Sequence, residues 1–135
     1  MKLQSTYIHL RSVRFHAFIG VGEQERKVGN EYLLDLRLGY PFARAIETDD
    51  VEDTLNYADV FETVRQTIAC PTRLLEHAAG NIVHALEERY PKIESIDLTL
   101  TKLNPPMGAD CAGASVELHL KRTQLEPYTN TETGK

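Results

Sequence analysis

Strict alternation of apolar and polar side chains in two separate stretches constrains this fold more than any other feature. In EYLLDLRLGY, residues 31–40, every second residue from Tyr32 onwards is apolar or aromatic. In residues 93–102, which end in SIDLTLTK, Ile96, Leu98 and Leu100 share one parity. A period of two places such side chains on one face of a strand. The pattern therefore predicts an antiparallel sheet with one buried face.

Two further stretches predict the remaining strands. Residues 6–19 are rich in β-branched and aromatic types, and their parity changes near Arg11 and Ser12, which is typical of a β-bulge. Residues 112–121 alternate again. The polar stretch GVGEQERKVGN, residues 20–30, predicts the loop of an antiparallel hairpin between the first two strands.

Two helices are expected between the second and third strands. After the acidic connection ETDDVEDTL, Asn56 and Asp59 have the spacing of a helix start, and apolar residues then recur at helical spacing as far as Ile68. A second apolar stripe runs from Leu74 to Leu86. The order ββααββ predicts an α+β fold, in which a four-stranded antiparallel sheet carries two helices on one face. Closing several copies into a ring-shaped barrel would pair the two open sheet edges.

Length and charge restrict the possible partners. A chain of 135 residues favours one domain, over residues 1–122, and we expect the polar tail at 123–135 to be disordered. A formal net charge of −5 argues against nucleic acid as a partner. No stretch approaches the ~20 apolar residues of a membrane span, so no membrane association is expected. Cys70 and Cys111 predict reduced thiols in a cytoplasmic protein.

Lys102 is the first candidate for chemistry. It continues the parity of the buried face of its strand, and two prolines follow it in TKLNPP. One interpretation is a lysine that extends to water at a strand end. The alternative is a partly desolvated lysine that exchanges protons near neutral pH.

Glutamates and a tyrosine are the other candidates. Glu76 lies in the first turn of the second helix, where it either complements the helix dipole or offers a carboxylate to a ring with an amino group beside a ring N–H, such as guanine or pterin. Tyr57 begins the first helix and could orient a water or donate a proton. Glu25 lies in the polar loop, with Glu23 as its rival.

Metal and cofactor sites are not predicted. His77 and His84 are seven positions apart, whereas a helical metal pair is usually spaced by four. The sequence contains no dinucleotide or phosphate-binding loop that would indicate a cofactor.

The chain resembles the dihydroneopterin aldolases of the tunnelling-fold group from about Tyr7 to Arg122. The markers that carry the resemblance are FIGV with a glutamate five residues after Gly20, GN before a strand, TDDVEDTLNYADV, LLEHAAGNIV and TKLNPP. One departure is Phe18-Ile19-Gly20, where many members have Tyr-His-Gly. The markers occur in the family's order and span nearly the whole chain.

The resemblance implies a carbon–carbon lyase of folate biosynthesis. The family cleaves 7,8-dihydroneopterin by a retro-aldol reaction to 6-hydroxymethyl-7,8-dihydropterin and glycolaldehyde. It uses no metal, no cofactor and no lysine Schiff base, because the dihydropterin's own C6=N5 imine accepts the electrons. Many members also epimerise dihydroneopterin, so an epimerase side activity is a further expectation.

The resemblance also implies roles for individual residues. Lys102 matches the family's general acid/base, Tyr57 matches the tyrosine that assists proton delivery, and Glu25 matches the loop glutamate near the substrate side chain. Glu76 matches the carboxylate that anchors the pterin, with the Leu75 backbone beside it.

The family's sites are shared between subunits. Tyr57 would come from a neighbouring chain together with Leu55 and Asn56, in a homotetramer or homo-octamer. Two alternatives to the aldolase remain at this point: a dihydroneopterin triphosphate 2′-epimerase, and a pterin-binding ring protein without catalysis.

Overall fold

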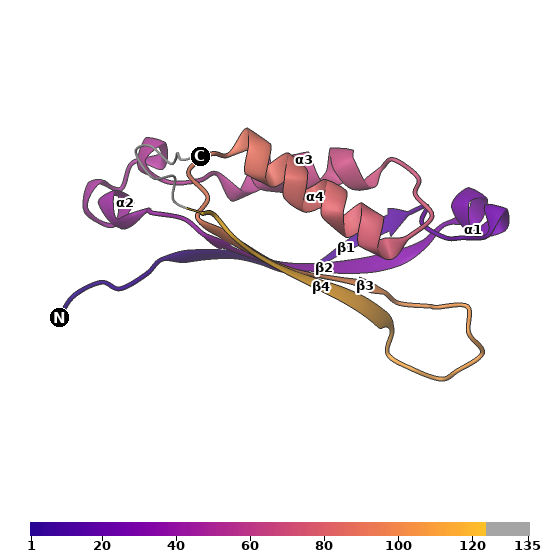
Figure 1. Cartoon of the computed structure of the whole chain (residues 1–135). Helices are drawn as coiled ribbons and strands as arrows, with labels where there is room; N and C mark the ends of the chain where they lie inside the picture. The colour runs from indigo at the N-terminus through magenta and orange to yellow at the C-terminus, as the bar shows by residue number, and fades with distance from the viewer. Residues whose placement is uncertain (124–135) are drawn as a thin grey trace, which may run out of the picture.

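The strands form one antiparallel sheet in the order in which they occur in the chain. The computed structural model describes residues 1–123. Figure 1 shows a single twisted sheet with its helices on one side. Its order is β1 (Tyr7–Ala17), β2 (Asn30–Gly39), β3 (Ser95–Lys102) and β4 (Ala114–Lys121). The predicted α+β fold with a four-stranded antiparallel sheet is confirmed.

The bulge predicted in β1 is present. The pairing register with β2 shifts between Leu10 and Val13, and Ser12 adopts a left-handed conformation with a φ of 50°. The backbone amide of Ser12 donates a hydrogen bond to Oδ1 of Asp35 at 2.9 Å. Two residues of β1 lie opposite one residue of β2 here, and this single extra residue resets the parity of the strand, so that the second half of β1 directs Phe15 into the core.

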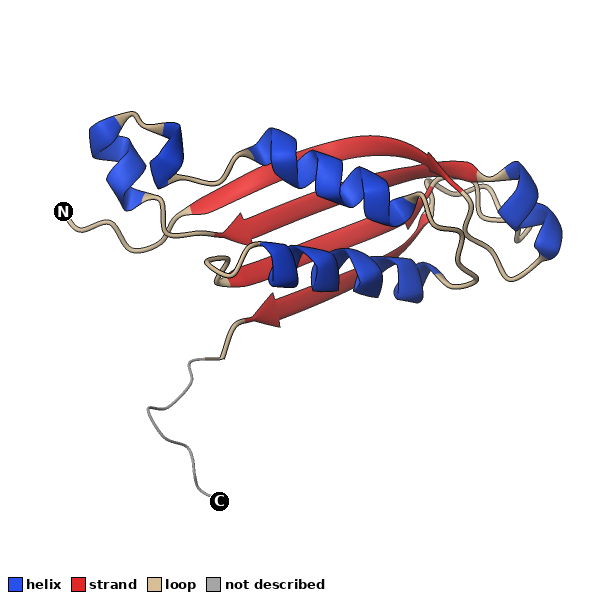
Figure 2. Ribbon diagram, turned by 90° about the horizontal axis from the view of Figure 1, so that it is seen from above, coloured by secondary structure: helices blue, strands red, loops and turns tan. Residues whose placement is uncertain are grey.

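Two long helices, α3 (Tyr57–Ile68) and α4 (Leu75–Arg89), cover one face of the sheet (Figure 2). The side chain of Asn56 caps α3 by accepting a hydrogen bond from the amide of Ala58 at 2.9 Å, as its position predicts. Leu74 was expected in the apolar stripe, but it precedes α4 as its N-cap and is 50% exposed. The buried residues of both helices pack against the inward side chains of the three strands β1 to β3.

Short helices occupy two segments that were expected to be loops. The expected hairpin loop contains α1 (Glu23–Val28), and the connection to α3 contains α2 (Ala43–Thr48) and a 3-10 turn, η1 (Val51–Asp53). An ion pair of 3.4 Å between Glu23 and Lys27 joins successive turns of α1. These helices bury no residue. They therefore lack the apolar stripe by which a helix is found in a sequence.

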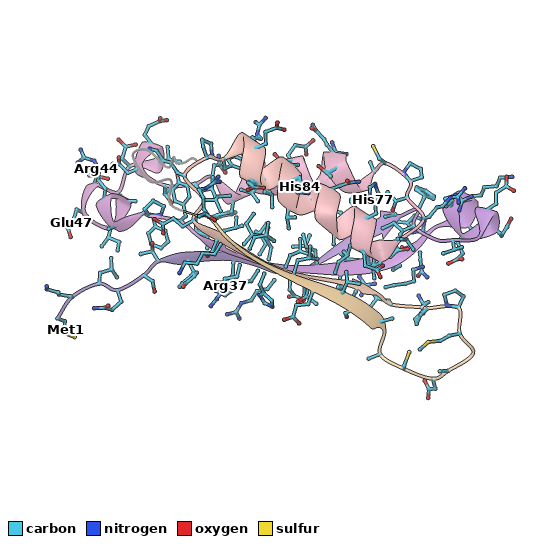
Figure 3. All side chains as sticks on the ribbon, in the orientation of Figure 1. Met1, Arg37, Arg44, Glu47, His77 and His84 are labelled. Carbon is cyan, nitrogen blue, oxygen red and sulfur yellow. The ribbon has the colours of Figure 1, made fainter. Side chains whose placement is uncertain are left out.

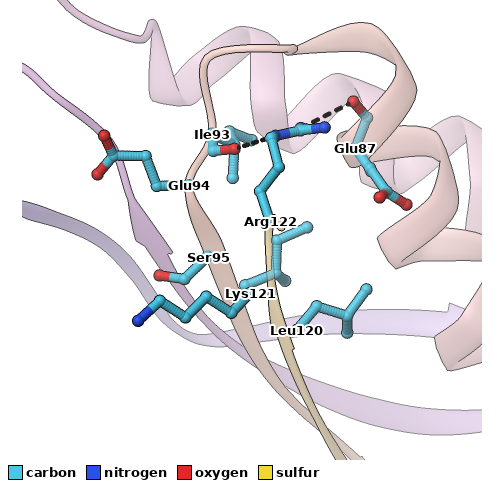
Figure 4. A pocket seen from close by; sticks show the side chains of 8 residues that line it. Glu87, Ile93, Glu94, Ser95, Leu120, Lys121 and Arg122 are labelled. Carbon is cyan, nitrogen blue, oxygen red and sulfur yellow. Dashed lines mark hydrogen bonds between the residues drawn. The ribbon is translucent and has the colours of Figure 1, made fainter. Parts of the chain in front are cut away.

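The last described residues are tied to α4. The guanidinium of Arg122 donates to the carbonyl of Ile93 at 2.8 Å and to that of Glu87 at 3.3 Å, beside a small surface cavity (Figure 4). Residues 124–135, nearly all of the predicted tail, lie outside the described residues. No helix within residues 1–123 has the length and apolar character needed to span a membrane.

The second face of the sheet carries charged side chains, and none of the helices in the described part of the chain packs against it. Figure 3 shows Arg37 on this face, directed away from α4. Its Nε lies 2.9 Å from Oδ2 of Asp97, whose other oxygen lies 2.5 Å from Nδ1 of His119. Within residues 1–123, β1 and β4 each pair with one strand only, so both edges of the sheet are open.

Candidate functional site

Lys102 lies on the helix-covered face at the last position of β3. It pairs with Tyr32 of β2 and with Ala114 of β4, and it has the same parity as the buried Leu100. Only 13% of its side chain is exposed. The lysine therefore does not extend into water, as one interpretation of the sequence had it, but remains at the end of the core.

The ammonium group of Lys102 has two partners. Nζ donates to the backbone carbonyl of Ile19 at 3.0 Å and lies 3.2 Å from Oε1 of Glu25. A lysine ammonium has three N–H donors. Among the described residues these two acceptors account for two of them, which leaves one donor for a substrate or a water.

The carbonyl of Ile19 is held in place by the loop between α3 and α4. Ile19 is buried and forms an isolated parallel bridge with Thr72. The amide of Gly20 donates to the Thr72 carbonyl at 3.0 Å, and the Thr72 amide donates to the Phe18 carbonyl at 3.2 Å. These bonds fix the backbone that follows β1, so the carbonyl of Ile19 is a rigid acceptor for Lys102.

Helix α1 brings Glu25 to Lys102. Oε2 of Glu25 accepts a hydrogen bond from the Gly22 amide at 3.1 Å, which leaves Oε1 for the lysine. Gly20 makes this approach sterically possible, because a Cβ atom there would lie 2.3 Å from Cβ of Glu25. Arg26 closes the turn by donating from Nη1 to the carbonyls of Gly20 and Val21, at 2.8 and 2.7 Å.

The carboxyl group of Glu25 is held in its ionised form. Its pKa is lowered from the ordinary value of 4.5, first by the hydrogen bond from the Gly22 amide and then by the Lys102 side chain. Glu23, its rival in the sequence, has a side chain that is 75% exposed and pairs with Lys27. Of the two glutamates, the structure brings only Glu25 to the lysine.

Tyr32 is a member of this cluster that sequence reasoning missed. Its hydroxyl donates to the carbonyl of Ile19 at 2.9 Å, beside the bond from Lys102. The residue is completely buried, and burial raises the pKa of its phenol to about 12. A buried tyrosine hydroxyl usually has a hydrogen-bond partner. The inward position of a tyrosine near the end of a strand was therefore a signal that it takes part in hydrogen bonding.

Glu76 and Leu75 lie at the same end of the molecule, at the start of α4. The Thr72 loop that contacts Ile19 leads directly into this helix. Glu76 is exposed, and the N-cap residue Leu74 makes no side-chain capping bond. The first amides of a helix have no partner within it, so this end offers backbone donors beside a carboxylate.

Tyr57, Asn56 and Leu55 lie at the opposite end. Tyr57 is 65% exposed at the start of α3, whereas Leu55 is buried in the core. Two residues further on, Asp59 accepts a hydrogen bond from Tyr90, close to the start of β3. Lys102 lies seven positions beyond Ser95 along β3, a span of about 23 Å at strand geometry. One chain does not bring Tyr57 to its own Lys102.

The histidines of α4 are not part of this cluster. His77 and His84 are both exposed on the outer side of the helix (Figure 3). Residues 1–123 contain no group of three or more His, Cys, Asp or Glu side chains arranged to hold a metal ion.

Comparisons with known proteins place the chain in a family. The model of the family FolB, dihydroneopterin aldolase, matches residues 8–119. A dihydroneopterin aldolase from Streptococcus pyogenes is 34% identical over 116 residues, which are 85% of this chain and 98% of the relative. The chain belongs to the dihydroneopterin aldolase family. The family predicted from the sequence markers is thus confirmed.

Solved structures of dihydroneopterin aldolases have the same fold. A FolB chain from Vibrio cholerae superposes with a TM-score of 0.81 at 25% identity, covering 89% of this chain and 100% of that one. An Escherichia coli dihydroneopterin aldolase in complex with neopterin superposes with a TM-score of 0.78 at 24% identity, covering 85% and 98%. The ββααββ order predicted from the sequence is therefore the fold of this family.

Proposed function

We propose that this chain is a 7,8-dihydroneopterin aldolase, a carbon–carbon lyase of folate biosynthesis. The products would be 6-hydroxymethyl-7,8-dihydropterin and glycolaldehyde. The observation that carries the proposal is Lys102, a lysine held almost out of water by Ile19 and Glu25 with one N–H donor left over. Family membership supplies the reaction class, and the E. coli relative binds a pterin.

The cleavage needs proton transfers but no external electron acceptor. A base removes the proton of the 2′-hydroxyl, the C1′–C2′ bond breaks, and C2′ becomes the aldehyde carbon of glycolaldehyde. The electron pair of the broken bond moves into the C6=N5 imine, which takes a proton at N5 and leaves an enol at C1′. Protonation of C1′ and loss of the N5 proton give the hydroxymethyl product.

Lys102 is the group that we assign to these transfers. Its remaining N–H donor would act through a water near N5 and the side-chain hydroxyls. Glu25 keeps the lysine at the end of β3 and, being ionised, would accept a hydrogen bond from a substrate hydroxyl. Tyr57 would assist proton delivery to the enol.

Glu76 is the group that we assign to binding. Its carboxylate can accept two parallel N–H bonds, from the 2-amino group and the neighbouring ring N–H of a pterin. The Leu75 amide at the start of α4 adds a donor for a ring acceptor.

The proposed site is completed by a second copy of the chain. Tyr57, Asn56 and Leu55 would come from a neighbouring protomer, because they lie at the other end of the sheet from Lys102. A homotetrameric ring, or two such rings in a homo-octamer, would also pair the open edges of β1 and β4.

Catalysis would need neither a metal nor a lysine Schiff base, since the imine of the substrate accepts the electrons. Full activity in EDTA, with no covalent lysine adduct after borohydride treatment with substrate, is the expected result.

A cytoplasmic location would suit the exposed free thiols of Cys70 and Cys111.

The decisive experiment is incubation with 7,8-dihydroneopterin while glycolaldehyde release is followed. The expected result is stoichiometric formation of glycolaldehyde and 6-hydroxymethyl-7,8-dihydropterin, both formed about 10³-fold more slowly by Lys102→Ala. Absence of cleavage, with dihydroneopterin triphosphate converted to its 2′-epimer, would replace the aldolase with the epimerase. Binding of neopterin without turnover of either substrate would leave a pterin-binding protein.

A further inference from the structure

The peptide unit between Ile19 and Gly20 is held from both sides. A trans peptide is planar, and its C=O and N–H point in opposite directions. The Gly20 N–H donates to the carbonyl of Thr72, and the Ile19 C=O on the other side accepts from Tyr32 and from Lys102. The plane of this one peptide therefore determines where the lysine finds its backbone acceptor.

The two donors to the Ile19 carbonyl differ in character. Lys102 exchanges protons in the proposed reaction, so its hydrogen bond to the carbonyl weakens whenever the nitrogen gives up a proton. Tyr32 is completely buried, and its phenol, with a pKa raised to about 12, remains a donor across the whole working pH range. A donor that does not titrate keeps the carbonyl oriented while the other donor changes its charge.

The register of the sheet makes the two donors neighbours. Tyr32 and Lys102 are directly opposed residues of β2 and β3, and Nζ of the lysine lies 5.9 Å from the centre of the tyrosine ring. The ring packs in the core below the ammonium, while the hydroxyl reaches the same carbonyl. We propose that Tyr32 is a positioning residue whose hydroxyl, through the Ile19 carbonyl, holds the ammonium of Lys102 in place for proton transfer.

The catalytic role of Tyr32 rests on the proposed function. The hydrogen bonds that join Tyr32, Ile19 and Lys102 do not depend on it. Tyr32→Phe is the test, because it keeps the ring and removes only the hydroxyl. Ile82→Val, which removes one methyl group from a fully buried side chain of α4, is the matched control for a modest loss of stability.

Two measurements separate positioning from a general loss of stability. In Tyr32→Phe, kcat should fall about five- to tenfold because the acid/base group is misplaced. KM and the Kd for neopterin should change by less than about twofold, because the groups that bind the pterin are untouched. Ile82→Val should leave kcat and KM unchanged. An unaltered kcat in Tyr32→Phe, or an equal loss in Ile82→Val, overturns the proposal.

The second measurement needs no substrate. Acetylation of Lys102 is followed by mass spectrometry relative to Lys27, whose side chain is 68% exposed. In Tyr32→Phe the ratio of the acetylation rate of Lys102 to that of Lys27 should rise about fivefold. This factor corresponds to the loss of one ordinary hydrogen bond. Ile82→Val should keep the wild-type ratio. An unchanged ratio in Tyr32→Phe overturns the positioning role, whereas absence of wild-type aldolase activity refutes only the proposed function.

Discussion

Lys102 and Glu25 are 77 positions apart in the chain, and they form an ion pair with Nζ 3.2 Å from Oε1. The lysine ends a core strand, and the glutamate belongs to a six-residue helix that buries nothing. The sheet thus fixes one partner, and a surface turn built on Gly20 and Gly22 delivers the other.

Lys102→Ala should separate catalysis from binding. The variant loses the acid/base group, so kcat should fall about 10³-fold, whereas the Kd for neopterin, measured by titration, should stay within about threefold. We expect the fold to tolerate the change, because the hydrogen bonds from Tyr32 to Ile19 and from Gly22 to Glu25 do not involve the lysine. Lys27→Ala is the surface control. A loss of neopterin affinity as large as that of Glu76→Ala would contradict the assigned roles.

Glu76→Ala should have the opposite profile. Loss of the charged hydrogen bonds to the pterin should weaken neopterin binding about 10²-fold. The side chain is exposed at the start of α4, so stability should fall by no more than about 0.3–1 kcal/mol, the worth of an acid in a first turn. Isothermal titration and thermal unfolding measure both quantities. Glu88→Ala, at the other end of the helix, should leave binding intact, and loss of affinity there would refute a specific role for Glu76.

Mixed oligomers should test the shared site. Lys102→Ala and Tyr57→Phe chains, each of low activity, are dissociated together and reassembled. If Tyr57 serves the neighbour's Lys102, about a quarter of the sites in a random hybrid contain both wild-type residues, and activity returns. Lys102→Ala mixed with Glu25→Gln should stay inactive, because both residues come from the same chain. Equal recovery in both mixtures, or in neither, contradicts the arrangement.

Two glycine substitutions should move stability in opposite directions. Gly20→Ala places a Cβ atom 2.3 Å from that of Glu25, and the resulting strain should cost about 1–3 kcal/mol and displace α1. Gly80→Ala, in the interior of α4, meets no atom within 4 Å, and it should stabilise the protein by about 0.5–1 kcal/mol. Chemical denaturation of both variants measures the two changes in unfolding free energy. A neutral Gly20→Ala would show that Glu25 does not need this close approach.

The ion pair should appear in the acid stability of the protein. The pKa of Glu25 is lower in the folded state than its ordinary value of 4.5, so the unfolded chain binds more protons as the pH falls past that value. The stability contributed by Glu25 is complete above 4.5 and disappears as the pH falls through the lowered folded pKa. The difference in unfolding free energy between wild type and Glu25→Gln should therefore be constant at neutral pH. It should decrease as the pH falls into the acid range. A difference that stays constant throughout the acid range would exclude this linkage.

The positions that the sequence predicted well are those that a period of two or of 3.6 determines. Alternation placed Lys102 on the core face of β3, and the parity change located the bulge of β1. Helix α1 was missed because six residues without a buried side chain have no periodicity to detect. For the same reason, the loop pattern alone left Glu23 as a rival of Glu25, and the turn at Gly22 is what distinguishes the two in the structure.

The backbone acceptor of Lys102 and the tyrosine that shares it could not be predicted from the sequence for a different reason. Tyr32 has the parity of a core residue, which indicates that its hydroxyl has a hydrogen-bond partner, but nothing in the pattern identifies that partner. The acceptor that it shares with Lys102 is a backbone carbonyl, a group common to every residue. Its position depends on the long-range contact with Thr72, which no local pattern encodes.

Because residue 19 supplies only its carbonyl to Lys102, the identity of its side chain carries no information about whether this acceptor is present. The isoleucine side chain packs in the core and takes no part in the hydrogen bond to the lysine. The neighbouring position is different, since a side chain at Gly20 would collide with Glu25. The glycine at position 20 is therefore the residue that reports on the approach of Glu25, whereas the side chain at position 19 is constrained only by its packing in the core.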